Sequence, residues 1–206
     1  MVTWGRMETK SRAKPLPPED RRVAIVEAVI PLIMQQGASV TTSAMAEAAG
    51  IAEGTIFRVF PDKSTLLLEA LKTCFDPAPA LDQLARIERD LPFEIKLRKA
   101  AAIILQRAER VYAVAAVLRT LPPPERPSHE EAHKSAIEAN SLISWGLTRI
   151  FEDEANCLAV EPARAAAAFR GLLHAVNFPL SDPSELITAD EAVEVLLHGV
   201  SSTEAD

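Results

Sequence analysis

Apolar residues recur with a helical period along most of this chain, after a polar start that contains several prolines. The spacing i, i+4, i+7 and i+8, which places side chains on one helix face, is met by Ile25, Val29, Leu32 and Ile33. This first predicted helix begins near Glu19 and ends at Gly37. Apolar and polar residues nowhere alternate for long enough to build a sheet. The pattern predicts an all-α protein.

Three shorter helices are expected next, each with its own start or stop signal. Thr41 and Thr42 carry hydroxyls that can cap a helix, and Gly50 supplies the left-handed residue that closes the same helix. Phe60-Pro61 breaks the following helix, and Asp62 caps the one after it. The expected ranges are 43–49, 53–59 and 63–75. A long helix followed by two short ones around a tight glycine turn is typical of a helix-turn-helix.

Beyond residue 75, proline-rich or turn-forming stretches separate the predicted helices. The stretch 76–79 contains two prolines and is interpreted as an inter-domain joint, and Pro122, Pro123 and Pro124 interrupt the chain again. Helices are expected near 80–90, 93–121, 129–155, 161–178 and 188–199.

The formal net charge of −7 is unevenly distributed along the chain. Residues 1–75 carry nine Lys and Arg against eight Asp and Glu, whereas residues 76–206 carry 13 against 21. Coulomb repulsion therefore disfavours a polyanion at the C-terminal part, and any nucleic acid is expected to meet the N-terminal part.

The N-terminal pattern closely resembles the TetR family of transcriptional regulators over residues 20–75. The resemblance is carried by Thr41-Thr42, Met45-Ala46, Ala49-Gly50-Ile51, Gly54-Thr55-Ile56-Phe57, Phe60, Lys63 and Leu66. It implies a flexible basic arm over 1–18, a three-helix helix-turn-helix DNA-binding domain over 19–75, and a helical ligand-binding and dimerisation bundle over 76–206. It also implies a homodimer that represses transcription and leaves a pseudo-palindromic operator in double-stranded DNA when a small molecule binds.

The resemblance also assigns DNA contacts. The residues it places at the DNA are Thr41, Thr42, Ser43, Glu53, Gly54, Thr55, Phe57, Arg58 and Lys63. Arg58 is the expected base contact, bidentate to guanine in the major groove, and Lys63 is an expected phosphate contact. Phe57 stands where the family commonly has tyrosine, and Ala52 replaces a capping serine at a cost of ~1 kcal/mol. Because Glu53 adds a negative charge and Val59 replaces a frequent histidine, a helical ligand-binding protein that has lost DNA binding is kept as an alternative.

By the same resemblance, the dimer interface uses segments 129–155 and 161–178, where small residues from Ala165 to Ala175 suit close helix packing. An effector pocket is expected among the middle helices, and its apolar character suits a hydrophobic or aromatic small molecule. The residues expected to line it are Leu71, Phe75, Ile103, Ile104, Arg107, Tyr112, Trp145, Phe169, His174 and Asn177.

A competing motif starts at residue 129. His129, Glu130 and His133 match the H-E-x-x-H pattern of zinc hydrolases, in which two histidines share a helix face. Ser128 and Glu131 also form a capping box, which explains the acidic first turn without a metal. Because no third ligand pattern follows, we expect no enzyme, no metal and no cofactor, and keep the zinc hydrolase as a second alternative.

The remaining features indicate a cytoplasmic protein. An uncharged apolar run of 18 residues does not occur, so no membrane-spanning helix is expected. The basic N-terminus is not followed by an apolar stretch and is therefore not a signal peptide. Cys74 and Cys157 are expected to be reduced, packed thiols.

Overall fold

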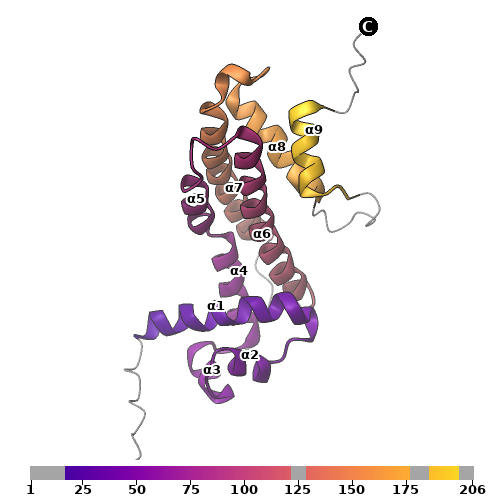
Figure 1. Cartoon of the computed structure of the whole chain (residues 1–206). Helices are drawn as coiled ribbons and strands as arrows, with labels where there is room; N and C mark the ends of the chain where they lie inside the picture. The colour runs from indigo at the N-terminus through magenta and orange to yellow at the C-terminus, as the bar shows by residue number, and fades with distance from the viewer. Residues whose placement is uncertain (1–16, 122–128, 177–185, 200–206) are drawn as a thin grey trace, which may run out of the picture.

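The computed structural model describes residues 17–121, 129–176 and 186–199, and every regular element in these ranges is helical. The all-α prediction is confirmed. Figure 1 shows one helix lying across the foot of a column of longer helices, with two short helices beneath it. The first four helices, which we call the head, are α1 (Pro18–Gln36), α2 (Thr42–Ala48), α3 (Glu53–Val59) and α4 (Lys63–Phe75), with a 3₁₀ turn at Gly37–Ser39.

Local signals set the boundaries of these helices. Thr41 Oγ1 accepts a hydrogen bond from the backbone N–H of Ala44 at 3.2 Å, so Thr41 caps α2 and the helix starts one residue earlier than expected. Asp62 Oδ1 accepts from the N–H of Thr65 at 2.6 Å and caps α4 as predicted. That backbone hydrogen bond lowers the pKa of the Asp62 carboxyl group, because it favours the charged form.

The upper helices are α5 (Ala78–Ala85), α6 (Phe93–Arg119), α7 (His129–Glu152), α8 (Pro162–Val176) and α9 (Ala189–His198), with a 3₁₀ turn at Ala155–Cys157. The helix expected over 80–90 begins earlier, because Pro79 fits the first turn of a helix, and it ends at Ala85. Cys74 is buried as expected, but Cys157 lies in the 3₁₀ turn and is exposed. The prediction of a packed thiol at Cys157 is therefore wrong.

Two hydrophobic cores hold the described residues together. The lower core joins the head to the last turns of α6, through Val114, Val117 and Leu118. The upper core joins α5, α7, α8 and α9 to the first turns of the same helix, through Leu97, Ala100 and Ala101. A 27-residue helix thus contributes to both cores.

Polar contacts fix the upper end of α6. Lys96 is buried, donates a hydrogen bond to the carbonyl of Arg89 at 3.1 Å, and pairs with Glu154 beyond the end of α7. Arg98 pairs with Glu194 at 2.9 Å and with Asp190, both on α9. These ion pairs bind α6 to the segments that follow α7 and to α9.

Candidate nucleic-acid interface and internal cavity

The turn between α2 and α3 fixes the angle of α3. Gly50 has φ +66°, a left-handed conformation that favours glycine, and its N–H donates to the carbonyl of Glu47 at 3.0 Å. The N–H of Ile51 donates to the carbonyl of Ala46, also at 3.0 Å. Behind the turn, Met45, Ile56 and Phe60 are fully buried. Packing therefore leaves α3 one orientation, with its other face in solvent.

The outer face of α3 carries most of the residues predicted to meet DNA. Glu53, Gly54, Phe57 and Arg58 are exposed, and Thr55 is half-buried. Phe57 leaves 48% of its surface in solvent, although it is a large aromatic residue. A Cβ atom added to Gly54 would meet no other atom within 4 Å, so packing within the chain does not require glycine there.

Other residues predicted to meet DNA lie at the starts of α2 and α4. Ser43 is exposed, and Thr42 is the first residue of α2. Lys63 Nζ donates to the carbonyl of Val40 at 2.6 Å, a contact between residues 23 positions apart that the sequence did not indicate. The ammonium group has three donors, so this bond leaves two of them for other acceptors.

A hollow of about 330 Å³ separates the start of α1 from α3. Arg58 and Thr55 line it on one side, and Arg21 and Arg22 line it on the other. Arg22 donates to the carbonyl of Val59 at 2.6 Å, and its guanidinium carbon lies 4.5 Å from the centre of the Phe60 ring.

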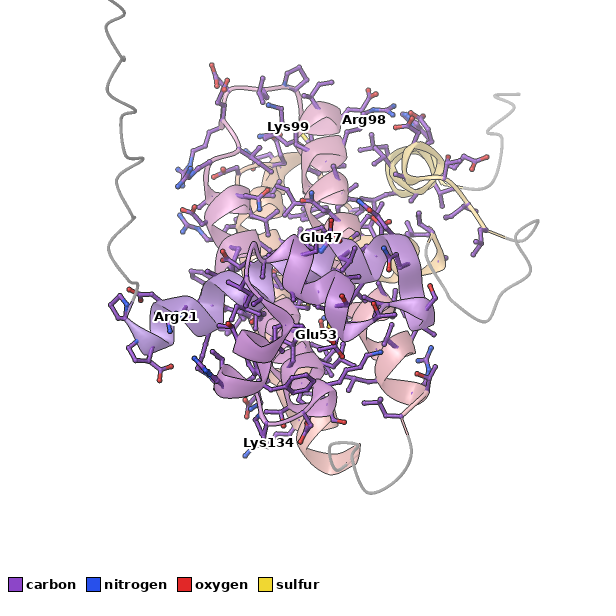
Figure 2. All side chains as sticks on the ribbon, turned by 90° about the horizontal axis from the view of Figure 1, so that it is seen from below. Arg21, Glu47, Glu53, Arg98, Lys99 and Lys134 are labelled. Carbon is purple, nitrogen blue, oxygen red and sulfur yellow. The ribbon has the colours of Figure 1, made fainter. Side chains whose placement is uncertain are left out.

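Arg21 and Arg22 were missed as site residues. A signal was present, because two adjacent arginines near a helix N-terminus oppose the helix dipole and need a separate reason. Figure 2, which views the head from below, shows Arg21 at the edge of this end of the molecule, while Glu47 and Glu53 lie nearer its middle.

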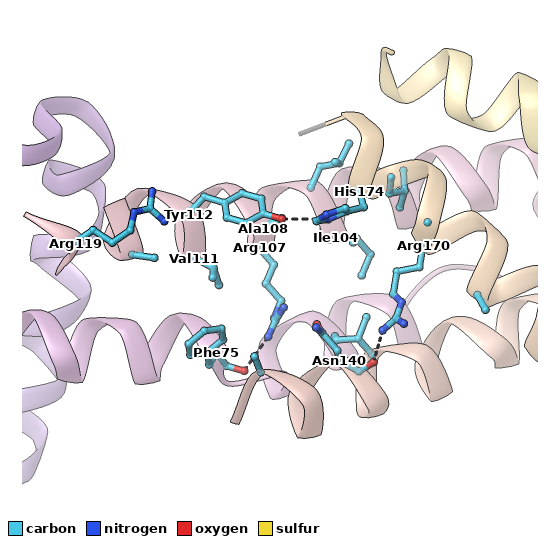
Figure 3. A pocket seen from close by; sticks show the side chains of 17 residues that line it. Phe75, Ile104, Arg107, Ala108, Val111, Tyr112, Arg119, Asn140, Arg170 and His174 are labelled. Carbon is cyan, nitrogen blue, oxygen red and sulfur yellow. Dashed lines mark hydrogen bonds between the residues drawn. The ribbon is translucent and has the colours of Figure 1, made fainter. Parts of the chain in front are cut away.

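The described residues also enclose a cavity of about 620 Å³ between the end of α4 and helices α6, α7 and α8. Five of the predicted pocket residues line it together: Phe75, Ile104, Arg107, Tyr112 and His174 (Figure 3). The sequence missed Arg119, Asn140 and Arg170. A signal existed for Arg119, because Ile104, Ala108, Val111, Ala115 and Arg119 follow one another at helical spacing on the same face of α6.

Four other predicted pocket residues do not line this cavity, and Asn177 lies outside the described residues. Leu71 is buried in the lower core and Phe169 in the upper core, while Ile103 packs against the upper core. Trp145 leaves 61% of its surface in solvent on the outer face of α7, with the Arg149 guanidinium carbon 5.6 Å from the ring centre. These four expectations are corrected accordingly.

The polar groups of the cavity are mostly paired. Tyr112 Oη lies 3.2 Å from His174 Nδ1, and burial raises the pKa of the Tyr112 phenol. Arg170 donates to the carbonyl of Asn140 at 3.0 Å. Arg107 Nη2 donates to the carbonyl of Phe75 at 2.9 Å, and burial lowers the pKa of Arg107.

The outer faces of α7 and α8 expose small and apolar side chains. On α7 these are Ile137, Leu142 and Trp145, each about half exposed. On α8, Ala168, Gly171 and Ala175 are exposed at helical spacing, and Gly171, which also lines the cavity, has no atom within 4 Å of an added Cβ. This surface lies in the segments where the sequence predicted a dimer interface.

The zinc-hydrolase motif begins at the first residue of α7, but the side chains of His129, Glu130 and His133 lie outside the described residues. Within the part that is described, no three His, Cys, Asp or Glu side chains lie close enough together to hold a metal ion. The described helices are also too short or too polar to cross a membrane.

Comparison with known proteins finds similarity to bacterial regulators. Residues 25–70 match the family model described as bacterial regulatory proteins, tetR family. A putative TetR-family transcriptional regulator from Mesorhizobium loti has a similar structure, with 15% identity, a TM-score of 0.58, and coverage of 89% of this chain and 98% of that one.

Two further solved structures share the fold. A TetR transcriptional regulator from Streptomyces coelicolor is 20% identical, with a TM-score of 0.59 and coverage of 88% of this chain and 99% of that one. The TetR-like transcriptional regulator LfrR from Mycobacterium smegmatis, solved in complex with proflavine, is 18% identical, with a TM-score of 0.52 and coverage of 89% and 98%.

Proposed function

We propose that this chain, which belongs to the TetR family of bacterial regulatory proteins, represses transcription as a homodimer and releases its operator when a small molecule fills the cavity. The observation that carries the proposal is the exposed face of α3, held in place by a glycine turn and three fully buried side chains. An α-helix presented in this way fits the major groove of B-DNA.

Arg58 is the residue proposed to read bases. It is exposed on α3 beside Thr55, and a guanidinium group can donate two hydrogen bonds to guanine. Lys63 and the hydroxyls of Thr42 and Ser43 are proposed to contact phosphates, with Arg21 as an additional cation at the edge of the same end. Phosphate contacts position the protein but do not select a sequence.

The dimer is proposed to form through the outer faces of α7 and α8. Exposed apolar residues such as Ile137 and Trp145 gain most from burial, and the small residues on α8 allow two helices to approach closely. A two-fold axis there would present two α3 helices to half-sites about 34–36 Å apart. The operator is therefore proposed to be pseudo-palindromic.

The effect of ligand binding on the DNA-binding head is proposed to be transmitted through α4 and α6. Phe75, the last residue of α4, lines the cavity, and its carbonyl accepts the hydrogen bond from Arg107 on α6. α4 begins beside α3, while α6 contributes to both cores. A ligand that displaces the end of α4 would change the spacing of the two heads and disfavour the DNA-bound state. The fold similarity to a regulator solved with proflavine supports small-molecule binding.

One observation favours the alternative of a ligand-binding protein without DNA binding. Glu53 lies on the face proposed to meet DNA, and Glu47 lies on α2 beside it, so two negative charges approach the phosphates (Figure 2). Selection of DNA fragments from a random pool by the purified full chain separates the two functions. The proposal expects enrichment of one palindrome with two half-sites, whereas no enrichment at 50 mM salt favours the alternative.

A further inference from the structure

One hydrogen-bond donor of the Arg107 side chain has no acceptor at the cavity. Its Nη2 group donates to the carbonyl of Phe75 at 2.9 Å, but its Nε atom is buried and has no acceptor among the described residues. Buried polar groups are nearly always paired, since an unpaired donor loses its bonds to water without replacement. Figure 3 shows the guanidinium group between α6 and the end of α4, facing the cavity.

Three other polar side chains around the cavity already have partners. Tyr112 is paired with His174, and Arg170 donates to the carbonyl of Asn140. These contacts join neighbouring helices and leave less for a ligand to satisfy. Arg107 is therefore the group in this cavity for which a bound acceptor brings the largest gain.

The charge of the lining has one sign. Arg107, Arg119 and Arg170 contribute to it, and none of the described lining residues is an aspartate or a glutamate. Asp76 acts on Arg107 only as a more distant charge, and no carboxylate in the described ranges lies within 4 Å of the guanidinium. An arginine stays protonated even where burial opposes its charge. The lining of the cavity thus favours an anion and repels a cation.

The rest of the lining is apolar. Phe75, Leu105, Val111, Ile143 and Leu173 line the cavity. A volume of about 620 Å³ lies in the range of pockets that hold small organic molecules. A small inorganic anion would leave most of this apolar surface uncovered, so the ligand needs a hydrophobic body as well as a charge.

We infer that the cavity binds an apolar carboxylic acid, whose carboxylate accepts two hydrogen bonds from Arg107. The planar guanidinium group matches a carboxylate in this bidentate geometry. Because the same guanidinium group holds the Phe75 carbonyl, a carboxylate that reorients it weakens the contact between α6 and the end of α4. The inference rests on the proposed function only in making this acid the effector, since binding is measured without DNA.

Calorimetric titration of the full chain with matched probes tests the inference. The probes are 4-alkylbenzoates with butyl, hexyl and octyl chains, and the benzyl alcohols and benzylamines that carry the same chains. Because the acid gains charge-assisted hydrogen bonds, we expect it to bind about ten- to a hundredfold more tightly than its alcohol, with the amine weakest. Arg107→Gln keeps a donor for Phe75 and removes the charge, and it is expected to lower the affinity for the acid to that of the alcohol.

Arg86→Gln is the control, because this arginine is exposed at the C-terminal cap of α5, away from the cavity lining, and its side chain pairs with Asp82 one turn away. It is expected to bind acid and alcohol as the wild type does. Failure of all three acids to bind, equal affinity for acid and alcohol, or a preference for the acid that survives in Arg107→Gln would overturn the inference. If the chain binds the acid but selects no operator, the inference about the ligand stands and the proposed function is contradicted. If only the amines release the operator, the proposed function stands and the inference about the ligand is contradicted.

Discussion

Arg22 and Arg107 occupy comparable places in two different regions of this molecule. Each is partly buried, and each donates to the backbone carbonyl of the last residue of a neighbouring helix, Val59 of α3 or Phe75 of α4. In the head, the guanidinium group of Arg22 also lies over the Phe60 ring. In the cavity, Arg107 faces open volume and one of its donors is unpaired.

The difference shows how stability and binding are divided in this fold. No buried polar side-chain atom in the described part of the head lacks a hydrogen-bond partner, and Phe60 is completely buried, so the inner face of α3 is held against the core. The cavity leaves volume and hydrogen-bonding capacity unused, which lowers the stability of the unliganded state and makes ligand binding favourable. A firmly packed helix with one exposed face and a cavity with an unpaired donor are the two features that the proposed function requires.

The strongest test of the head compares two phenylalanines near the end of α3. Phe60→Ala removes a fully buried ring and is expected to lower the free energy of unfolding by about 3–5 kcal/mol, because a cavity remains. Phe57→Ala removes a half-exposed ring and is expected to change it by less than about 1 kcal/mol. Urea unfolding followed by circular dichroism measures both, and similar losses in the two variants would contradict the packing described for α3.

Operator affinity tests which residues of the head contact bases and which contact phosphates. Arg58→Ala is expected to cost about 1–3 kcal/mol at the selected operator and to relax sequence preference, because a base contact is lost. Lys63→Ala is expected to weaken all sequences alike and to lower the salt slope by about one. Fluorescence anisotropy over a salt series measures both, with Arg86→Ala as the control. Equal, sequence-independent losses in both variants would show that Arg58 does not read bases.

The two arginines provide a direct comparison of the regions. Arg22→Met is expected to lower the free energy of unfolding by about 1–2 kcal/mol, because it removes a hydrogen bond and a cation–π contact. Arg107→Met is expected to change it by less than about 1 kcal/mol without ligand, since loss of the bond to Phe75 is offset by relief of an unpaired buried charge. A larger loss at Arg107 than at Arg22 would mean that Arg107 is mainly a structural residue.

The smallest expected effect concerns pH. The pKa of Asp62 is lowered in the folded chain from an ordinary value of 3.8, so its cap contributes stability that is fully present above that value. The contribution is expected to disappear as pH falls through the lowered native pKa. Asp62→Asn keeps an acceptor without the charge, so its stability should change less with pH below 4 than that of the wild type. Identical acid profiles by thermal unfolding would contradict the cap.

Local sequence signals predicted the head well. The caps at Thr41 and Asp62 and the left-handed Gly50 act within a few residues, so the sequence contains the information that sets these boundaries. Arg22 and Lys63 instead contact carbonyls 37 and 23 residues away. No periodic pattern specifies such partners, because they depend on how the helices pack.

The cavity was predicted less well for a related reason. The resemblance to the TetR family placed Ile104, Arg107 and Tyr112 among the pocket residues, and all three line the cavity, since one face of α6 forms much of it. It did not separate Phe169, which is buried in the upper core, from Trp145, which is exposed. Large aromatic residues suit cores, cavities and interfaces alike, and only the packed structure shows which of these each one joins.

Operator binding in the presence of a saturating ligand measures the coupling between the cavity and the head. The full chain is titrated onto fluorescently labelled selected operator with and without 4-hexylbenzoate at a concentration shown by calorimetry to fill the cavity. We expect the ligand to weaken operator binding about 5- to 150-fold, the usual range for coupled sites, and Arg107→Gln to show no such response. An unchanged operator affinity with the cavity filled would contradict the coupling.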